Sequence, residues 1–197
     1  MGLKERKAKE KIERKELILN AAMNLIKSSG VQALTMRKLA ELIEYSPCVV
    51  YETFSNKNAL VVELFSKVCS ELLYAMQSIN SIDPEDYFKQ LIFKDVEFMM
   101  QESHRVELFT IVSMETSPKK FPPHMQEVIQ LIGKGLKGLG YSKLSTQQEI
   151  EDAQDVLRTF LAGLLKLIIS QKSVNGQARC KRILENGLNL LLEGWKN

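Results

Sequence analysis

The side chains best suited to recognition chemistry gather between Ile43 and Lys57, in the segment IEYSPCVVYETFSNK. This segment carries the Cys48 thiol, the Tyr51 phenol and the Glu52 carboxylate, followed by the Lys57 amine. These groups donate or accept hydrogen bonds, but none has a neighbour at the spacing of a nucleophile and its base. The segment therefore predicts binding rather than catalysis.

The rest of the 197-residue chain has no catalytic motif either, since GxSxG, HExxH and a phosphate loop are absent. The glycines of 133-GKGLKGLG-140 have no strand before them and indicate a weakened helix end rather than a dinucleotide-binding turn. His104 and His124 each lack a second ligand at metal spacing. The three cysteines form no CxxC pair, as expected for reduced thiols in a cytoplasm. We therefore predict a cytoplasmic protein that is not an enzyme and that uses no metal or cofactor.

No apolar run reaches the roughly 20 residues of a membrane span, so no membrane partner is expected. The basic charge is N-terminal: residues 1–57 hold 11 Lys and Arg against 7 Asp and Glu (net +4), and residues 58–197 hold 16 against 17 (net −1). This asymmetry favours nucleic acid as a partner. A solvated helical arm remains an equal alternative, because the pairs Glu5–Lys9 and Glu10–Arg14 have helical spacing.

Helices must position the recognition side chains, because apolar periods near 3.6 dominate and no strand pattern occurs. An apolar face beginning at Ile18 ends at Gly30, and Thr35 is a predicted cap for Met36–Ile43. Ser46, followed by proline, predicts a short helix ending near Phe54. Further helices are predicted at about 57–79, 84–101, 103–116, 123–139, 146–171 and 177–194, with loops at 117–124 and 172–177. About nine helices give an all-α fold.

The second and third of these helices, joined at Glu44-Tyr45, have the layout of a helix-turn-helix. The side chains expected to pack inward are Leu39, Ile43, Val50 and Phe54. The side chains expected to point away are Pro47, Cys48, Val49, Glu52 and Thr53. The DNA major groove admits a helix and distinguishes all base pairs, so this exposed face is the candidate reading surface.

The segment Ile18–Leu60 resembles the DNA-binding domain of the tetracycline-repressor (TetR) family, over about a quarter of the chain. The matching positions are Ala21, Ala22, Gly30, Thr35, Leu39, Ala40, Ser46, Tyr51, Phe54, Lys57 and Leu60. The resemblance implies DNA contacts from Thr35, Arg37, Pro47, Cys48, Val49, Tyr51, Glu52, Thr53 and Lys57. Arg37 would reach a base edge or a phosphate. Pro47, Cys48, Val49 and Glu52 of the reading helix would face the floor of the major groove. Tyr51, Thr53 and Lys57 would contact phosphates.

The sequence departs from the family pattern in two ways. In the turn, Glu44 stands where the family usually has glycine, and Tyr45 stands where it has a small apolar residue. Glu44 would cost about 1 kcal/mol if the turn keeps φ > 0. The reading helix has no Lys or Arg, so base reading would depend on apolar contacts, Arg37 and Glu52. Two alternatives remain open: Tyr51 packs between helices rather than on a phosphate, and Cys48 is a redox sensor rather than a small residue at the DNA surface.

The resemblance implies a transcriptional repressor with a DNA-binding domain at 1–56 and an effector-binding and dimerisation domain at 57–197. A homodimer on a near-palindromic operator is expected. The predicted dimer interface comprises Phe160, Leu161, Leu164, Leu165, Ile168, Leu184, Leu188 and Leu191. An apolar or amphipathic effector would be a further partner.

The predicted effector pocket comprises Phe98, Met99, His104, Phe109 and Met114, because methionine and phenylalanine concentrate between residues 93 and 125. Glu97, Glu107 or Glu115 would provide a polar anchor. A closed core without a ligand is an equal alternative. It corresponds to an architectural or cell-division DNA-binding protein that has the same DNA-binding domain and no effector.

Overall fold

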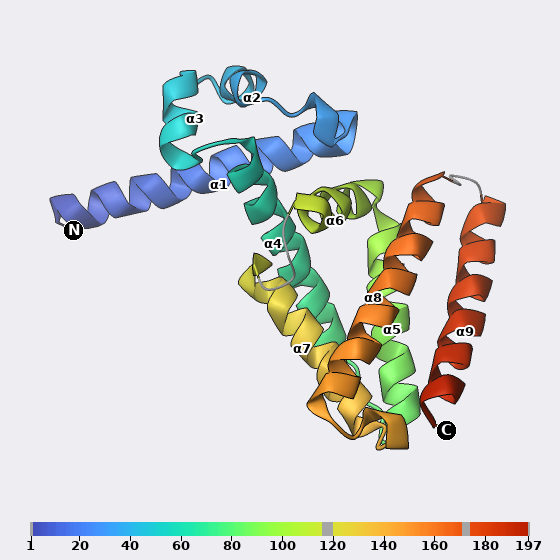
Figure 1. Ribbon diagram of the computed structural model, residues 1–197. Coiled ribbons are helices and arrows are strands. Elements are labelled where there is room, and N and C mark those ends of the chain that lie inside the picture. The colour runs from blue at the N-terminus through green and yellow to red at the C-terminus, as the bar shows by residue number, and fades with distance from the viewer. Residues whose placement is uncertain (1, 116–119, 171–173, 197) are drawn as a thin grey trace.

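The computed structural model describes residues 2–115, 120–170 and 174–196, in which all regular structure is helical (Figure 1). The α-helices are α1 (Leu3–Ser29), α2 (Met36–Leu42), α3 (Pro47–Thr53), α4 (Lys57–Gln77), α5 (Pro84–Gln101), α6 (Ser103–Glu115), α7 (Pro123–Gly138), α8 (Gln147–Ser170) and α9 (Val174–Lys196). Short 3-10 turns lie at Val31–Ala33 (η1) and Ser142–Leu144 (η3). The predicted all-α fold is confirmed over these ranges.

The helices form a head of α1–α3 and a body of α4–α9, with α4 running from one into the other (Figure 1). The N-terminal part of α1, before Arg14, projects from the head as an arm (Figure 1). Its ion pairs join Arg6 to Glu10 (3.0 Å) and Lys9 to Glu13 (3.7 Å), and Glu5 accepts a hydrogen bond from the Gly2 backbone. Glu10 thus pairs with Arg6 rather than with Arg14 as predicted, and Lys9 pairs with Glu13 rather than with Glu5.

Several of these helices have an N-cap residue whose side chain accepts a hydrogen bond from the first turn. The Thr35 hydroxyl accepts from the Lys38 backbone N–H at 3.2 Å, and the Asp83 carboxylate accepts from the Asp86 N–H at 2.7 Å. Asn56 caps α4 in the same way through the Ala59 N–H, at 2.8 Å; from the sequence, Asn56 was predicted only as a break between helices. Ser46 occupies the N-cap position of α3, but its hydroxyl makes no cap bond.

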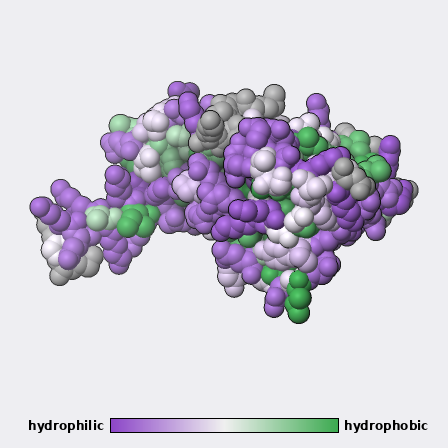
Figure 2. Space-filling view, turned by 60° about the horizontal axis from the view of Figure 1, so that its bottom comes forward, coloured by the Kyte–Doolittle hydropathy of each residue, from purple (hydrophilic) through white to green (hydrophobic). Residues whose placement is uncertain are grey.

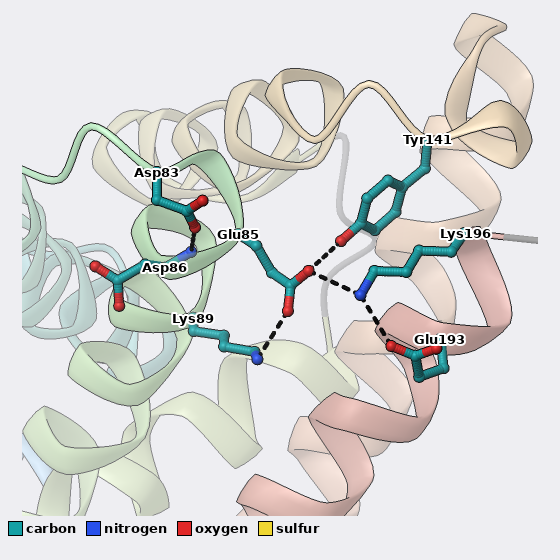
Figure 3. A network of polar contacts seen from close by, with 7 residues as sticks. All are labelled: Asp83, Glu85, Asp86, Lys89, Tyr141, Glu193 and Lys196. Carbon is teal, nitrogen blue, oxygen red and sulfur yellow. Dashed lines mark hydrogen bonds and ion pairs between the residues drawn. The ribbon is translucent and has the colours of Figure 1, made fainter.

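The body packs α5, α6 and α7 around α4, with α8 between them and α9 (Figure 1). The start of α5 is joined to the end of α9 at Glu85, which bonds Tyr141 at 2.5 Å, Lys89 at 2.9 Å and Lys196 at 3.0 Å (Figure 3). Hydrogen bonds from Tyr141, Lys89 and Lys196 lower the pKa of Glu85 to about 2. This network holds the C-terminal end of α9 against the body.

Two predicted loops differ in outcome. Residues 117–119 of the predicted 117–124 loop lie outside the described residues, and α7 begins at Pro123. Residues 174–177 of the predicted 172–177 loop are helical instead, because α9 begins at Val174, and residues 172 and 173 lie outside the described residues. Asn175 and Gly176 are weak helix formers, so tertiary packing overrides local propensity there.

Candidate nucleic-acid interface

The turn between α2 and α3 keeps a left-handed residue, because Glu44 has φ 57°. The Tyr45 N–H returns to the Ala40 carbonyl at 3.0 Å and closes the turn. Residues other than glycine, asparagine and aspartate seldom adopt this conformation, because their Cβ approaches the carbonyl oxygen. Glu44 therefore holds the turn geometry that glycine would hold without strain.

Replacing Glu44 with glycine should stabilise the protein by about 1 kcal/mol, because the steric cost of positive φ disappears. Urea unfolding monitored by circular dichroism measures the change. Glu44→Ala is the matched control, since it removes the carboxylate but keeps a Cβ, and its stability should stay within about 0.5 kcal/mol of wild type. A less stable glycine variant, or an equal gain from alanine, would contradict the strain assignment.

The inner face of the helix-turn-helix is closed, since Leu39 and Val50 have no exposed surface and Ile43 and Phe54 are buried. The exposed residues predicted to contact DNA are Thr35, Arg37, Pro47, Cys48, Tyr51 and Glu52. Val49, Thr53 and Lys57 are half-buried. The structure thus presents most of the predicted reading residues on the surface, and their contacts with DNA remain predictions.

Glu52 is positioned by residues on two helices. The Cys48 thiol lies 3.7 Å from one carboxylate oxygen, and the Arg14 guanidinium of α1 lies 4.0 Å from the other. Arg14 was not predicted as a site residue, although its place in the basic N-terminal segment was a usable signal. Arg14 supplies a cation beside a reading helix that has no Lys or Arg of its own.

Lys57 holds the head to the body at Val31, the first residue of η1. The Lys57 ammonium donates to the Val31 carbonyl at 3.1 Å, and the Val31 N–H donates to Glu107 of α6, also at 3.1 Å. The next residue toward α1, Gly30, has φ 77°, and a Cβ built there would lie 3.5 Å from the Glu107 carboxylate. The phosphate contact predicted for Lys57 therefore competes with a bond inside the free protein.

His104 lies at this same junction rather than near a cavity. It is buried, and its Nδ1 lies 3.2 Å from Glu102, which also pairs with Lys27 of α1 at 3.7 Å. Burial lowers the pKa of His104. Although it was predicted for the effector pocket, His104 is not among the residues that line the cavity described below, and it lies in the first turn of α6, beside the head.

The arm carries three further exposed cations, Lys4, Lys7 and Lys11, spaced three and four residues apart on one side of the helix. None of them forms an ion pair with a described residue. The arm projects as a largely hydrophilic extension (Figure 2). Such a row of free cations suits a phosphate backbone, whose affinity for basic groups is sequence-independent.

The body contains a cavity of about 600 Å³ between α4, α5, α6, α7 and α8. Its apolar wall includes Leu72, Met99, Phe109, Met125, Ile129 and Leu157. Two of the predicted pocket residues, Met99 and Phe109, line it, whereas the ring of Phe98 lies 3.7 Å beneath the Arg105 guanidinium. The side chains of Met114 and Glu115 lie outside the described residues.

Two of the three carboxylates predicted as polar anchors for this pocket interact with other parts of the chain. Glu97 is exposed and lies 3.1 Å from Lys181, and Glu107 accepts from Val31. The carboxylates that line the cavity are instead Asp95 of α5 and Glu151 and Asp155 of α8, none of which was predicted from the sequence. A signal existed, because Asp95 interrupts the apolar stripe of α5 at helical spacing.

The residues predicted for the dimer interface face mainly into their own chain. Leu161, Leu164, Leu165, Leu184 and Leu188 are buried, Phe160 and Leu191 are half-buried, and the side chain of Ile168 lies outside the described residues. The outer face of α8 and α9 instead carries Val156, 48% exposed, and Leu190, 75% exposed. Gly163 also faces outward there, with no atom within 4 Å of a built Cβ.

Residues 18–64 match the family model described as "Bacterial regulatory proteins, tetR family". The chain is similar to two Bacillus subtilis proteins, the HTH-type transcriptional regulators YhgD and YvkB. YhgD is 26% identical over 140 residues, which are 71% of each chain. YvkB is 29% identical over 154 residues, which are 74% of this chain and 78% of the relative.

Solved structures resemble the whole fold. BioQ bound to its DNA operator has a TM-score of 0.67 at 19% identity, with 92% of this chain and 97% of BioQ covered. A TetR variant from Acinetobacter baumannii in complex with minocycline has a TM-score of 0.70 at 18% identity, with 91% and 94% covered. These likenesses establish the arrangement of the helices.

Proposed function

The chain belongs to the TetR family of helix-turn-helix transcriptional regulators, and from that premise we propose that it is a ligand-responsive repressor that binds a palindromic operator as a homodimer. The observation that carries the proposal is the exposed outer face of α3, held on a buried α2–α3 packing at the place where the family model matches. We assign residues 1–56 to DNA binding, and residues 57–197 to effector binding and dimerisation.

Selection of bound fragments from a random DNA pool tests this function. A dimer with two identical reading heads should enrich a near-palindrome with half-sites about one helical turn apart, or a multiple of that spacing. A pool that shows no enrichment after repeated selection, although the protein is folded, would overturn the proposal.

Arg37 and Glu52 should determine part of the operator sequence, because both side chains are exposed and can make directional hydrogen bonds to base edges. Arg37→Ala and Glu52→Ala should each relax discrimination at one or two positions of a half-site by about 1–3 kcal/mol. Competition binding with single-base operator variants measures this loss.

Lys38→Ala is the control for that experiment, since Lys38 is the exposed neighbour of Arg37 on α2. A phosphate contact or no contact at Lys38 should leave the preferred sequence unchanged. If the Arg37 and Glu52 variants select the wild-type motif, neither residue reads a base.

The cavity in the body supports a ligand response, because its wall includes Leu72 of α4 and Phe109 of α6. The same two helices hold the Val31 backbone of the head, through Lys57 and Glu107. A ligand that prefers one arrangement of α4 and α6 would therefore favour one placement of the reading heads. The coupling free energy of such a linkage is typically about 1–3 kcal/mol.

The proposed dimer uses the outer face of α8 and α9, where Val156, Gly163 and Leu190 leave apolar surface and room for close approach. Two such helix pairs would pack as a four-helix bundle across a two-fold axis.

We propose no catalytic activity and place the protein in the cytoplasm, where its three free cysteines would stay reduced. None of the described helices is long and apolar enough to cross a membrane. An architectural DNA-binding protein without an effector is the second candidate, and the cavity of about 600 Å³ disfavours it.

A further inference from the structure

Asp95 is a carboxylate on the buried side of α5. Leu91 and Ile92 one turn earlier and Met99 one turn later are all buried. Asp95 itself is half-buried and lines the cavity of the body. Its carboxylate forms no hydrogen bond and no ion pair with any described residue, so its charge has no partner among them.

A carboxylate in apolar surroundings is unfavourable unless another group compensates it. Burial accordingly raises the pKa of Asp95 to about 7. The nearby Cys69 thiol offers no compensation, since it is buried and its pKa is raised as well. The arrangement is costly in the empty protein and would be relieved by a positive charge placed in the cavity.

The other charged groups of the cavity wall reinforce this preference. Glu151, Asp155 and Arg158 of α8 complete the charged lining, so the wall carries three acids against one base when Asp95 is ionised. The Arg158 guanidinium lies 3.0 Å from Asp155 and is therefore already paired. Among the described lining residues no unpaired cation remains to attract an anion.

Apart from the amides of Gln126, Gln130 and Gln154, the remaining wall is apolar and adaptable. Met99 and Met125 are flexible side chains that pack against varied shapes, and Phe109 offers a flat ring. The volume of about 600 Å³ lies within the range typical of small-molecule sites, roughly 300–1,000 Å³. The cavity thus combines room for bulky apolar groups with one uncompensated acid.

We propose that the effector is a lipophilic cation whose charged centre lies beside Asp95 and whose apolar groups contact Met99, Phe109 and Met125. This assignment rests on the proposed function, in which the cavity is the effector site, and it adds the class of ligand. Asp95 determines the sign of the charge that the cavity accepts, and the apolar wall determines the size.

Two ions of nearly equal shape and opposite charge test the assignment: tetraphenylphosphonium and tetraphenylborate. Isothermal titration calorimetry on the full chain, in sodium buffer, gives both dissociation constants. Tetraphenylphosphonium should bind wild type at least about tenfold more tightly than tetraphenylborate. Asp95→Asn, which has nearly the same shape but no charge, should weaken tetraphenylphosphonium binding by about tenfold or more.

Two further variants serve as controls for the effect of the Asp95 charge. Glu97→Gln removes a carboxylate from the same helix that is exposed and paired with Lys181, and its affinity for tetraphenylphosphonium should equal that of wild type. Asp95→Glu keeps the charge and should keep the preference for the cation. Equal binding of the two ions by wild type, no binding of either, or unchanged cation affinity in Asp95→Asn would each overturn the proposal.

The operator found by DNA selection separates this inference from the proposed function. If tetraphenylphosphonium binds through Asp95 and lowers operator affinity, both stand. If it binds through Asp95 but leaves operator affinity unchanged, the cation site stands and the ligand response fails. If the operator is found and neither ion binds, the DNA-binding function stands and the cation site fails.

Discussion

Replacing Leu190 with glutamate should convert the dimer into folded monomers. Leu190 is 75% exposed in the single chain, so the charge costs little there. Within an interface it would be desolvated without a partner, and the two-fold axis places it there twice. The dimer should weaken by about 2 kcal/mol or more, and specific operator affinity should fall with it, because two half-sites must be bound together.

Sedimentation velocity and operator titration measure the two effects on the same samples. Ile82→Glu is the matched control, since Ile82 is fully exposed in the loop between α4 and α5 and should stay dimeric. Leu188→Glu differs, because Leu188 has no exposed surface within its own chain and the variant should unfold. A folded Leu190→Glu protein that remains dimeric would place the interface on another face.

Asp95→Asn should abolish a loss of stability that wild type suffers as the pH rises from about 4 to 7. The pKa of Asp95 is about 7 in the folded chain and 3.8 ordinarily, so between these values only the unfolded chain has released the proton. The free energy of unfolding therefore falls with increasing pH until the folded pKa is passed. The upper bound of the loss is about 4 kcal/mol.

Urea unfolding of wild type and Asp95→Asn at pH 5 and pH 8 measures this difference, and other titrating groups cancel between the two proteins. The asparagine variant should gain on wild type at pH 8 by more than at pH 5. Glu97→Gln should show no such gain, because Glu97 is exposed and paired. The same stability difference at both pH values would show that Asp95 is not desolvated in the folded chain.

The head could be predicted closely because its signals are local. Thr35 caps α2, proline opens α3, and the inward positions Leu39 and Val50 recur at helical spacing. At Glu44 the sequence predicted a steric cost only on the condition that the turn keeps φ > 0. Glutamate seldom adopts that conformation, so the residue type alone did not predict it. Packing on both sides of the turn fixes φ there, and no local pattern encodes that.

The helices of the body could be predicted from the sequence, but which face of each helix packs inside the chain and which stays exposed could not. The stripe containing Leu161, Leu164 and Leu165 is apolar enough to cover a partner, and in the structure it fills the core of its own chain. An apolar stripe shows that a helix face is buried and does not show by what. The positions of Asp95 in the cavity and of Lys57 on Val31 depend equally on helices distant in sequence.

The two bonds at Val31 have a consequence for building chimeric regulators. Lys57 and Glu107 both bind main-chain atoms of this residue, so the two bonds do not depend on its side chain, which is buried in the core. A DNA-binding module transplanted from another relative would meet the same two bonds if it reproduced the backbone path through Gly30 and kept an apolar residue at the next position. Operator choice could then be exchanged while the sensor half, with its cavity and Glu107, is kept.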